Sequence, residues 1–468
     1  MKYYITSPIY YANDNPHIGH IGTTIFSDII ARYHRLKEDD VLFLTGLDEH
    51  GEKVYLASQK ASKEPQPFVD ELSLKWQDYW KKLNINYDIF MRTTLPEHKD
   101  VVRQLLKQIK ENGDIYKAAY KGVYCVGCEE FKSEHDLVDG CCPEHRPDQI
   151  SLKEEENYFF KLTKYIPTIK QYIADGTLPL EPEGKRKEIL ARLDEEIHDL
   201  SISRQNLPWG IKLPWDENQT TYVWVEALMS YYSATKILEK PDFWPADLHF
   251  LGKGNNWFHS VIWPALLLSL QLPLPKKIFV HGYYNVEGKK VGKSLGNAVS
   301  AEQLLEKYGT DGTRFLLATS MPYSADSDVN FAWFNEKYNS DLANGLGNLV
   351  ARVAKLCENN SVIAILSLSK EKQSLCFYSK IIPLIEGYKF NEVLSFIWSE
   401  ISEADKKINE TKPWELNPDK AKPILEDLVL KIQQIAFNLK PFLPETSEKI
   451  LKQFSGKIKT SVSLFPRI

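Results

Sequence analysis

The sequence predicts an α/β protein in which a parallel, doubly wound sheet is split by an inserted module and followed by a helical bundle. Three observations lead to this fold class. Strand-like and helix-like segments alternate up to about residue 115, and the alternation returns after an interruption that contains a cluster of cysteines. Beyond residue 294 the apolar spacing is helical almost throughout. Alternating strands and helices are typical of a parallel sheet covered by helices.

Length and composition are those of a globular protein with several domains. The 468 residues exceed what one core normally serves, and 43% hydrophobic with 26% charged residues excludes a disordered chain. The start Met1–Thr6 lacks the features of a signal peptide, and the longest apolar stretch, near Val261–Leu270, is too short to span a membrane. We therefore expect a cytoplasmic protein without a membrane segment, whose net charge of −5 gives no overall attraction for nucleic acid.

The first part of the sheet is predicted from the first 50 residues. Tyr3–Thr6 and Asp40–Thr45 have the composition of buried strands, and Ile21–Leu36 between them has helical apolar spacing. Ligands of such sheets bind at the carboxyl ends of the strands, where His17–His20 and Asp48 would both lie.

The second part of the sheet is expected after an inserted module over about residues 116–215. Strand character returns at Thr221–Val225, at His249–Gly252 and at Ile278–His281. A sheet interrupted by an insertion explains both sets of strands.

The last part of the chain is predicted to be a bundle of antiparallel helices. Ser300–Gln303 forms a capping box for a helix that continues through Tyr308. Asp341–Glu358, Phe390–Lys407 and Ala421–Leu439 all repeat apolar residues with a period of 3.6.

One candidate phosphate-binding segment lies between the first strand and the first helix. Asn15 is expected to cap this helix, with Pro16 in its first turn and His17 and His20 on one face beside the positive end of the helix dipole. Gly19 allows a flat base to approach the backbone. Donors at a helix N-terminus suit a triphosphate, although two surface histidines near a turn would look the same.

A second candidate phosphate-binding segment follows the predicted strand Ile278–His281. It reads Lys290-Val291-Gly292-Lys293-Ser294 and resembles many lysine-containing surface loops when taken alone. Its lysines could stabilise the charge of a departing pyrophosphate. At opposite ends of a split sheet, the two segments together indicate an enzyme that activates a carboxylate with ATP.

A cysteine and histidine cluster in the insertion has the spacing of a zinc knuckle. Soft ligands in two pairs favour a closed, tetrahedral Zn²⁺ that stabilises a small module. The four predicted ligands are Cys125, Cys128, Cys142 and His145. Cys141 and His135 are alternative ligands, and unrelated reduced thiols are the competing interpretation.

With these motifs in order, the sequence resembles the class I aminoacyl-tRNA synthetases, and among them the methionyl-tRNA synthetases, along nearly its whole length. His17–His20 stands at the HIGH motif of this family and Lys290–Ser294 at its KMSKS motif. The other stretches that carry the resemblance are Thr45–Gly51, His198–Arg204, Tyr222–Trp224, Phe258–Ser260 and Trp263–Ala265.

The resemblance implies a split Rossmann-type catalytic domain and a methionine–tRNA ligase that uses ATP with Mg²⁺. Asp48 would hold the amino group of methionine, and His17, His20, Lys290 and Lys293 would support adenylation electrostatically. Gly19 and Ser294 would join His17, His20 and Lys293 in binding ATP. The residues implied for the methionine side-chain pocket are Ile9, Tyr11, Trp224, Ala227, Leu228, Tyr231 and His259. By spacing alone, Trp224 and Tyr231 would be assigned to the core.

In the helical region the resemblance implies recognition of the tRNA(Met) anticodon. Asn348 and Arg352 are one helical turn apart, and Trp414 follows Lys412-Pro413. They would recognise unpaired bases by hydrogen bonds and stacking. Without the resemblance, a tryptophan on a helical bundle would usually be assigned to the hydrophobic core. The chain ends at Ile468, soon after the bundle, so we expect a monomer without an appended tRNA-binding domain.

We expect five regions along the chain. They are a first catalytic half at 1–115, a zinc-knuckle insertion at 116–215, a second catalytic half at 216–289, a KMSKS-like and stem-contact region at 290–340, and an α-helical anticodon-binding domain at 341–468.

Departures from the family pattern keep two other functions open. Val291 and Gly292 replace the Met and Ser of KMSKS, and Glu226 stands where Asp is usual. Gly254 removes an expected carboxylate, and Asn255 places an amide near the methionine pocket. A buried, unpaired amide would cost about 1–3 kcal/mol. The alternatives are a paralogue that activates another amino acid and a catalytically impaired tRNA-binding protein.

Overall fold

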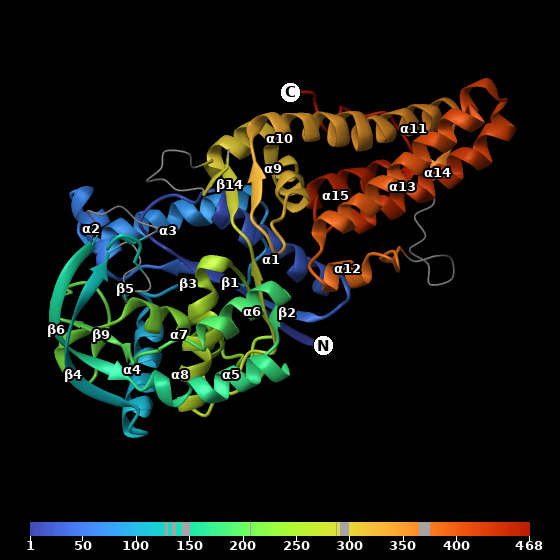
Figure 1. Cartoon of the computed structure of the whole chain (residues 1–468). Helices are drawn as coiled ribbons and strands as arrows, with labels where there is room; N and C mark the ends of the chain where they lie inside the picture. Colours follow the sequence, from blue (N-terminus) through green and yellow to red (C-terminus); the bar gives the residue numbers. More distant parts are fainter. Residues whose placement is uncertain are drawn as a thin grey trace. The chain divides into compact units, whose positions relative to one another are not determined.

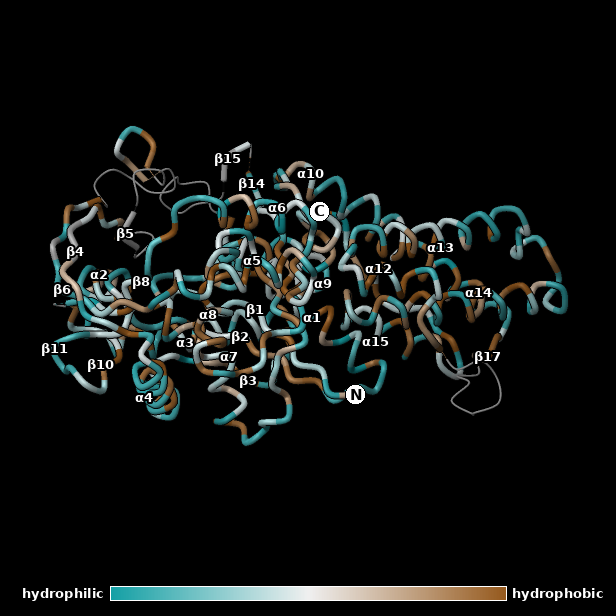
Figure 2. The backbone as a smooth tube through the Cα atoms, turned by 60° about the horizontal axis from the view of Figure 1, so that its bottom comes forward, coloured by the Kyte–Doolittle hydropathy of each residue, from teal (hydrophilic) through white to brown (hydrophobic). Residues whose placement is uncertain are grey.

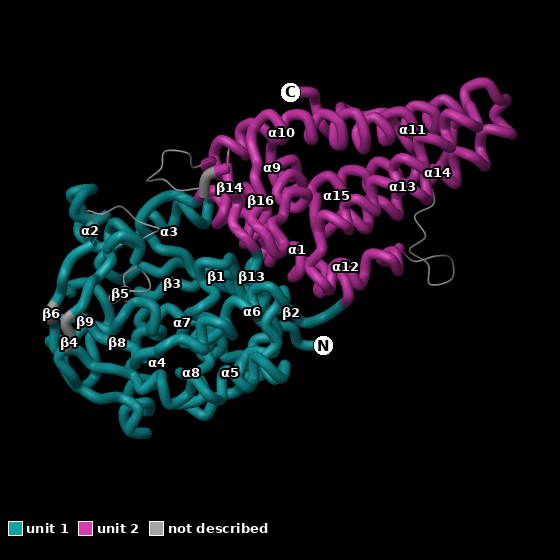
Figure 3. Tube along the Cα trace, viewed as in Figure 1, with its two compact units in different colours: residues 1–16, 38–78, 87–281 teal, residues 17–37, 79–86, 282–468 magenta. Residues whose placement is uncertain are grey.

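The residues described by the computed structural model form two compact units (Figure 3). The described residues are 1–126, 130–132, 137–142, 150–205, 207–286, 288–290, 299–364 and 375–468. The first unit comprises 1–16, 38–78 and 87–281, and the second comprises 17–37, 79–86 and 282–468. The chain passes between the units several times because α1 (Ile18–Leu36) and residues 79–86 both belong to the second unit.

A six-stranded sheet forms the centre of the first unit, and all of its strand pairs are parallel. Its order is β3-β2-β1-β12-β13-β7. The strands are β1 (Lys2–Tyr11), β2 (Asp40–Asp48), β3 (Ile89–Arg92), β7 (Leu180–Glu181), β12 (Leu248–Gly252) and β13 (Ile278–His281). The predicted α/β class with a parallel sheet is confirmed, and β1 and β2 extend beyond their predicted ends.

The strand order reverses between β1 and β12. These strands pair only over Ile5–Thr6 and Leu248–His249, beyond which β1 continues beside β2 and β12 continues beside β13. A point of reversal in a parallel sheet is where ligands bind, because connections leave it in opposite directions. The carboxyl ends of β1 and β12 are therefore the first place to look for a site.

Helices and short helical segments surround the central sheet, and the later helices, from residue 96 onward, share one hydrophobic core with it. The helices of this part are α2 (Glu52–Lys60), α3 (Pro65–Lys82, whose last turn belongs to the second unit), α4 (Pro96–Glu111), α5 (Ile166–Asp175), α6 (Glu183–Arg192), α7 (Val223–Ile237) and α8 (Trp263–Ser269). The short segments are η3 (Leu162–Lys164), η4 (Pro241–Phe243), η5 (Lys253–Asn255) and the π-helical η6 (Phe258–Ile262). Burial of apolar side chains from these helices stabilises the unit at roughly 25 cal/mol per Å².

Two smaller antiparallel sheets lie in the predicted insertion and just after it. The longer pair, β4 and β6, runs side by side as two long arrows (Figure 1). One sheet contains β4 (Ile115–Cys125), β5 (Glu130–Lys132), β6 (Ile150–Phe160) and β8 (Leu200–Ser201); the other contains β9 (Ser203–Gln205), β10 (Lys212–Leu213) and β11 (Asp216–Thr221). Because β7 joins the central sheet, this stretch is part of the first unit.

The predicted strand Thr221–Val225 is wrong. β11 ends at Thr221, and Val223 already begins α7. The β-branched and aromatic residues suggested a strand, but their strand preference depends on where they pack. Val223 and Val225 are buried in the helix, so the core decides the conformation.

The second unit is mainly helical. Figure 1 shows α13 (Phe390–Thr411) and α14 (Pro418–Leu439) running alongside each other. The other helical segments are α9 (Ala301–Thr319), α10 (Phe331–Lys337), the π-helical η8 (Tyr338–Gly347), α11 (Asn348–Asn359), α12 (Ile382–Glu386), η9 (Pro413–Glu415) and α15 (Pro444–Gln453). Its short strands are β14 (Tyr284–Val286), β15 (Lys289–Lys290), β16 (Ser327–Val329), β17 (Ile363–Ala364) and β18 (Gly456–Lys457). The predicted capping box at Ser300 and Gln303 is confirmed.

The helices of the second unit are amphipathic. The tubes of α13 and α14 alternate between hydrophobic and hydrophilic colours (Figure 2), as expected for surface helices that bury one face. Within the described ranges, no helix is long and apolar enough to cross a bilayer.

A buried ion pair joins α1 to α9. Arg314 lies 2.7 Å from Asp28, both side chains are fully buried, and Arg314 also donates to the carbonyl oxygens of Leu83, Pro441 and Phe442. Burial alone would raise the pKa of Asp28, but the guanidinium groups of Arg314 and Arg32 hold it below its ordinary value. The pair therefore ties four segments of the second unit together.

Arg314→Met should destabilise the second unit by about 3–5 kcal/mol, because it leaves the buried charge of Asp28 without a main partner. Denaturant unfolding followed by circular dichroism measures this loss. Since the pKa of Asp28 is depressed, its contribution exists above the pKa of the unfolded state and disappears on acidification. The difference between wild type and variant should therefore shrink below about pH 4.

The matched control is Lys406→Met, which removes an exposed ion pair with Glu410 in the same unit. It should change stability by less than about 0.5 kcal/mol. Equal effects of the two variants would contradict the role given to the buried pair.

Candidate active site

The carboxyl ends of β1 and β2 bring the first site residues together. In their register Tyr11 is opposite Asp48, and Ile9 is opposite Gly46. A Cβ atom at Gly46 would lie 2.0 Å from the carbonyl oxygen of Met91, so glycine is required for the close approach of β3. Asp48 is nearly fully buried where the strand ends.

α7 presents four of the predicted pocket residues at helical spacing. Trp224, Ala227, Leu228 and Tyr231 recur at intervals of three and four residues, which places them along one face. Ala227, Leu228 and Tyr231 are buried, and Trp224 is half-buried. The strand end and this helix face both belong to the first unit.

Aromatic rings form one wall of the site. Trp224 stacks on Phe258 with ring centroids 3.9 Å apart and planes 6° apart, and Tyr11 meets Trp224 edge-on at 5.9 Å. Phe258 was not predicted as a pocket residue. It begins the π-helical segment η6, a helix type frequent at functional sites, but this deviation has no signal in the sequence.

Tyr231 and His259 form a buried hydrogen-bonded pair. Their Oη and Nε2 atoms are 2.8 Å apart, and Nδ1 of His259 is 2.9 Å from the main-chain oxygen of Asn255. Because a carbonyl only accepts, Nδ1 carries the proton, and Nε2 accepts from the tyrosine hydroxyl. Burial lowers the pKa of His259 to about 4 and raises the pKa of Tyr231, so the pair is neutral at pH 7.

The contact that ties Asn255 to this pair is made by its main-chain carbonyl, which any residue at this position could supply. Gly254 is exposed on the short segment η5. Gly254 and Asn255 are two of the departures from the family pattern. Neither of their positions indicates a change of substrate.

The segment after Asp48 has no regular structure and is held by side chains. The main-chain NH of Glu49 donates to Thr93, its carbonyl oxygen accepts from Trp209 Nε1 at 2.6 Å, and its carboxylate accepts from Arg92 at 2.7 Å. His50 Nδ1 lies 2.5 Å from Glu226 Oε1 on α7. The buried segment therefore has a defined conformation.

In the second unit, His17 and His20 form the start of α1, and the prediction that Asn15 caps this helix is wrong. The N-cap is His17, whose Nδ1 accepts from the NH of Gly19 at 3.1 Å, while Nδ1 of His20 accepts from the NH of His17 at 3.3 Å. The two side chains thus satisfy amide groups that a helix start leaves open. Pro16 precedes the cap instead of lying in the first turn.

This capping arrangement orients both imidazole rings. The rings stack with centroids 3.8 Å apart, and because each Nδ1 is an acceptor, a neutral ring carries its proton on Nε2. A Cβ atom at Gly19 would lie 3.0 Å from Cε1 of His17, so glycine makes room for the folded-back ring. Two Nε2–H donors at a helix N-terminus are suited to binding an anion.

Of the second predicted phosphate segment, only Lys290 falls within the described residues. It ends β15, opposite Asn285 of β14. Lys293 and Ser294 lie outside the described residues.

Two of the four predicted zinc ligands are described. Cys125 ends β4, and it and Cys142 are both buried. Cys128 and His145 lie outside the described residues. Among the residues that the structure does describe, no three His, Cys, Asp or Glu side chains come together as a metal site. The two described cysteines are buried, and the other two predicted ligands are not described, so the zinc site stays a prediction.

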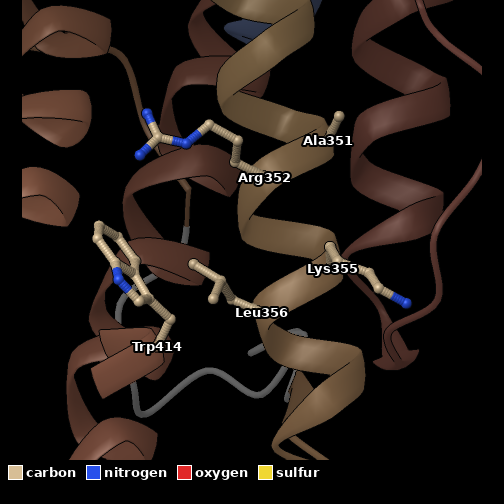
Figure 4. A pocket seen from close by; sticks show the side chains of 5 residues that line it. All are labelled: Ala351, Arg352, Lys355, Leu356 and Trp414. Atoms are coloured by element: carbon tan, nitrogen blue, oxygen red, sulfur yellow. The ribbon is translucent and has the colours of Figure 1, made fainter. Parts of the chain in front are cut away.

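Two of the predicted anticodon-binding residues line a cavity of about 430 Å³ in the second unit (Figure 4). It is lined by Ala351, Arg352, Lys355, Leu356 and Trp414. Asn348, the third predicted residue, is exposed one turn earlier on α11 and does not line this cavity.

Two polar side chains of α13 fix the guanidinium group of Arg352 beside this cavity. NH1 lies 3.1 Å from Asp405, and NH2 lies 2.9 Å from Asn409. Trp414 is 50% exposed, which is unusual for so large an apolar side chain and leaves its face accessible. A planar cation and an exposed indole are suited to contacts with an unpaired base.

Comparisons with known proteins identify the family of this chain. The model of the tRNA synthetases class I (M) family matches residues 3–151 and 147–354. The methionine–tRNA ligase of Thermotoga maritima is 41% identical over 98% of this chain and 76% of its own, and that of Clostridium acetobutylicum is 41% identical over 99% and 75%.

The fold is also that of a solved synthetase. The structure of Mycobacterium tuberculosis methionyl-tRNA synthetase in complex with methionyl-adenylate has a TM-score of 0.90 and 30% identity, with 100% of both chains covered. The free form of that enzyme has a TM-score of 0.81 and 28% identity, with 100% of this chain and 98% of that chain covered. From the family model, the relatives and this shared fold, it follows that the chain belongs to the class I tRNA synthetases of the methionine type and is an aminoacyl-tRNA ligase.

Proposed function

We propose that this enzyme activates methionine with ATP to methionyl-adenylate and transfers the methionyl group to tRNA(Met). The observation that carries this proposal is the neutral Tyr231–His259 pair beside the stacked Trp224 and Phe258, at the reversal point of a parallel sheet. Aromatic rings and polarizable sulfur attract each other, and a pair without net charge suits an uncharged thioether.

Selection of methionine would depend on both ends of the amino acid. Ile9, Tyr11, Ala227 and Leu228 would enclose the side chain, and Asp48 would hold the ammonium group. A buried carboxylate is well suited to an ammonium group because a charge-assisted hydrogen bond is about twice as strong as a neutral one. The side-chain pocket would discriminate against other amino acids, and Asp48 would discriminate against ligands that lack an ammonium group.

Adenylation would proceed by attack of the ionised carboxylate of methionine on the α-phosphorus of ATP. A bond forms between a carboxylate oxygen and the phosphorus, the bond to the bridging oxygen breaks, and pyrophosphate leaves with the electron pair. The nucleophile is already ionised, so the step needs alignment and charge stabilisation instead of a general base. The 3′-terminal ribose of tRNA would then attack the activated carbonyl and release AMP.

Phosphate contacts would come from the start of α1 and from the lysine-containing segment. The Nε2–H groups of His17 and His20 would donate to the phosphates beside the N-terminus of α1, with Gly19 leaving space there. Lys290 and Lys293 would balance the growing charge on pyrophosphate, and Ser294 would add a hydroxyl donor. Mg²⁺ would accompany ATP as part of the substrate.

The first test is ATP–pyrophosphate exchange with the purified protein, performed separately with each of the twenty amino acids. Methionine should be the only amino acid that supports exchange above background, because the pocket is aromatic, apolar and neutral at its base. Exchange with a different amino acid would favour the paralogue, and no exchange at all would favour a tRNA-binding protein without ligase activity.

Anticodon recognition is proposed for the cavity on α11. Trp414 would stack on an unpaired base, and Arg352, held by Asp405 and Asn409, would donate hydrogen bonds to a base edge. Asn348 would add a contact one helical turn away.

The oligomeric state and the cellular location are predictions from the sequence alone, which favours a monomer in the cytosol.

Trp414→Ala should reduce kcat/KM for tRNA(Met) about 5- to 150-fold, since stacking on one base is worth about 1–3 kcal/mol. Exchange with methionine should be unchanged, because this first step does not use tRNA. Initial rates of aminoacylation measured against tRNA concentration give the result.

The control for Trp414 is Leu430→Ala, which shortens another exposed apolar side chain of the same unit. It should leave charging unaltered. If both variants charge tRNA normally, the assignment of Trp414 to the anticodon is wrong.

We also propose that Cys125, Cys128, Cys142 and His145 hold one structural zinc ion. Emission spectrometry of the purified protein should find about one zinc per chain, and Cys128→Ser should lose it, because a closed site needs all four ligands. Cys376→Ser, which alters an exposed cysteine, is the control and should retain zinc. Loss of zinc from Cys141→Ser instead of Cys142→Ser would reassign the third ligand.

A further inference from the structure

We infer that Glu226 and His50 act as a positioning pair that sets Asp48, the proposed ammonium-binding carboxylate, relative to the methionine side-chain pocket. This inference rests on the proposed function, because it concerns how that pocket is assembled. His50 follows Asp48 by two residues at the end of β2, and Glu226 follows Trp224 by two residues at the start of α7. A contact between them therefore links the two ends of the amino-acid site.

The contact has the geometry of a strong hydrogen bond. His50 Nδ1 and Glu226 Oε1 are 2.5 Å apart, and the two side chains are 2% and 0% exposed. A buried carboxylate costs free energy unless it is paired. Within the described part of the chain, Glu226 Oε2 has no hydrogen-bond partner, so the carboxylate is hydrogen-bonded through Oε1 to His50, and the charge of Lys99 also acts on it.

The backbone between Asp48 and α2 depends on such contacts. Glu49 and His50 lie in no helix or strand, and Gly51 has a φ of +98°, which favours glycine. Trp209 contacts the segment at both sides, through Nε1 to the carbonyl of Glu49 and edge-on against the His50 ring at 5.2 Å. These contacts hold the segment from the side of Trp209, and the His50–Glu226 bond joins it to α7.

The consequence would be a fixed distance between the carboxylate that binds the ammonium group and the pocket that binds the methionine side chain. Trp224 and Tyr231 lie on the same helix as Glu226, and Asp48 lies on the strand that leads into His50. Displacement of the segment would move the Asp48 carboxylate away from the ammonium group, whereas Trp224 and Tyr231 would keep their places on α7. The pair would then influence affinity for the amino group and not for the thioether.

The test compares two ligands that differ only in the amino group. L-methionine and 4-(methylthio)butanoate, which lacks that group, are titrated calorimetrically into wild type and variants. Glu226→Gln should lower the preference for methionine over the amine-free ligand about 5- to 10-fold, because a neutral bond replaces a charge-assisted one. Affinity for the amine-free ligand should change less than about 2-fold, within the usual scatter of independent sites. Glu226→Asp, which keeps the charge, should retain more of the preference.

A double variant separates positioning from general weakening. If Glu226 acts through Asp48, then Asp48→Asn with Glu226→Gln should show no lower preference than Asp48→Asn alone. Tyr231→Phe serves as a pocket comparison and should weaken both ligands alike. Asp114→Asn alters another buried carboxylate of the first unit, bonded to Lys164, Tyr165 and Ser269, and should leave the preference unchanged.

Several outcomes would overturn the inference. They are an equal loss of both ligands in Glu226→Gln, no change in either, or additive effects in the double variant. If Glu226→Gln does not fold, judged by its melting curve, the same titrations with His50→Gln decide the question from the other side of the bond. Failure of wild type to bind methionine at all would instead contradict the proposed function.

Discussion

The reversal of strand order between β1 and β12 is the constraint on which the site in the first unit depends. The two strands pair only at Ile5–Thr6, so their carboxyl ends separate toward different neighbours. Side chains that follow both strands can converge there without competing for the hydrogen bonds of the sheet. Asp48, Tyr11 and His259 all come from segments that end or begin at this edge.

In both units, a hydrogen bond with the main chain determines which ring nitrogen of a histidine carries the proton. At the start of α1, His17 and His20 accept from main-chain amides, so their protons lie on Nε2. Beside the end of the central sheet, His259 donates from Nδ1 to a carbonyl, so its Nε2 accepts from Tyr231. In each place a main-chain group fixes the tautomer, and the tautomer decides whether the other ring nitrogen donates or accepts.

Much of the fold could be predicted because its signals are local. Alternation of strand and helix patterns, the capping box at Ser300 and the periodic helices from Phe390 onward all reflect preferences of neighbouring residues. Predictions were wrong where two signals competed locally. The aromatic and β-branched residues at Val223–Val225 suggested a strand, and Asn15 was a more typical cap than His17, yet core packing and the paired histidines prevailed.

By itself, the sequence determined the α/β class, the parallel sheet and the membership in the synthetase family, because motifs and periodicity are properties of the chain order. Only the tertiary structure decided which side chains meet. The stacking of Phe258 on Trp224, the tautomer of His259 and the bond between His50 and Glu226 join residues far apart in sequence. Such contacts depend on burial and on the register of the sheet, and neither is written in the local pattern.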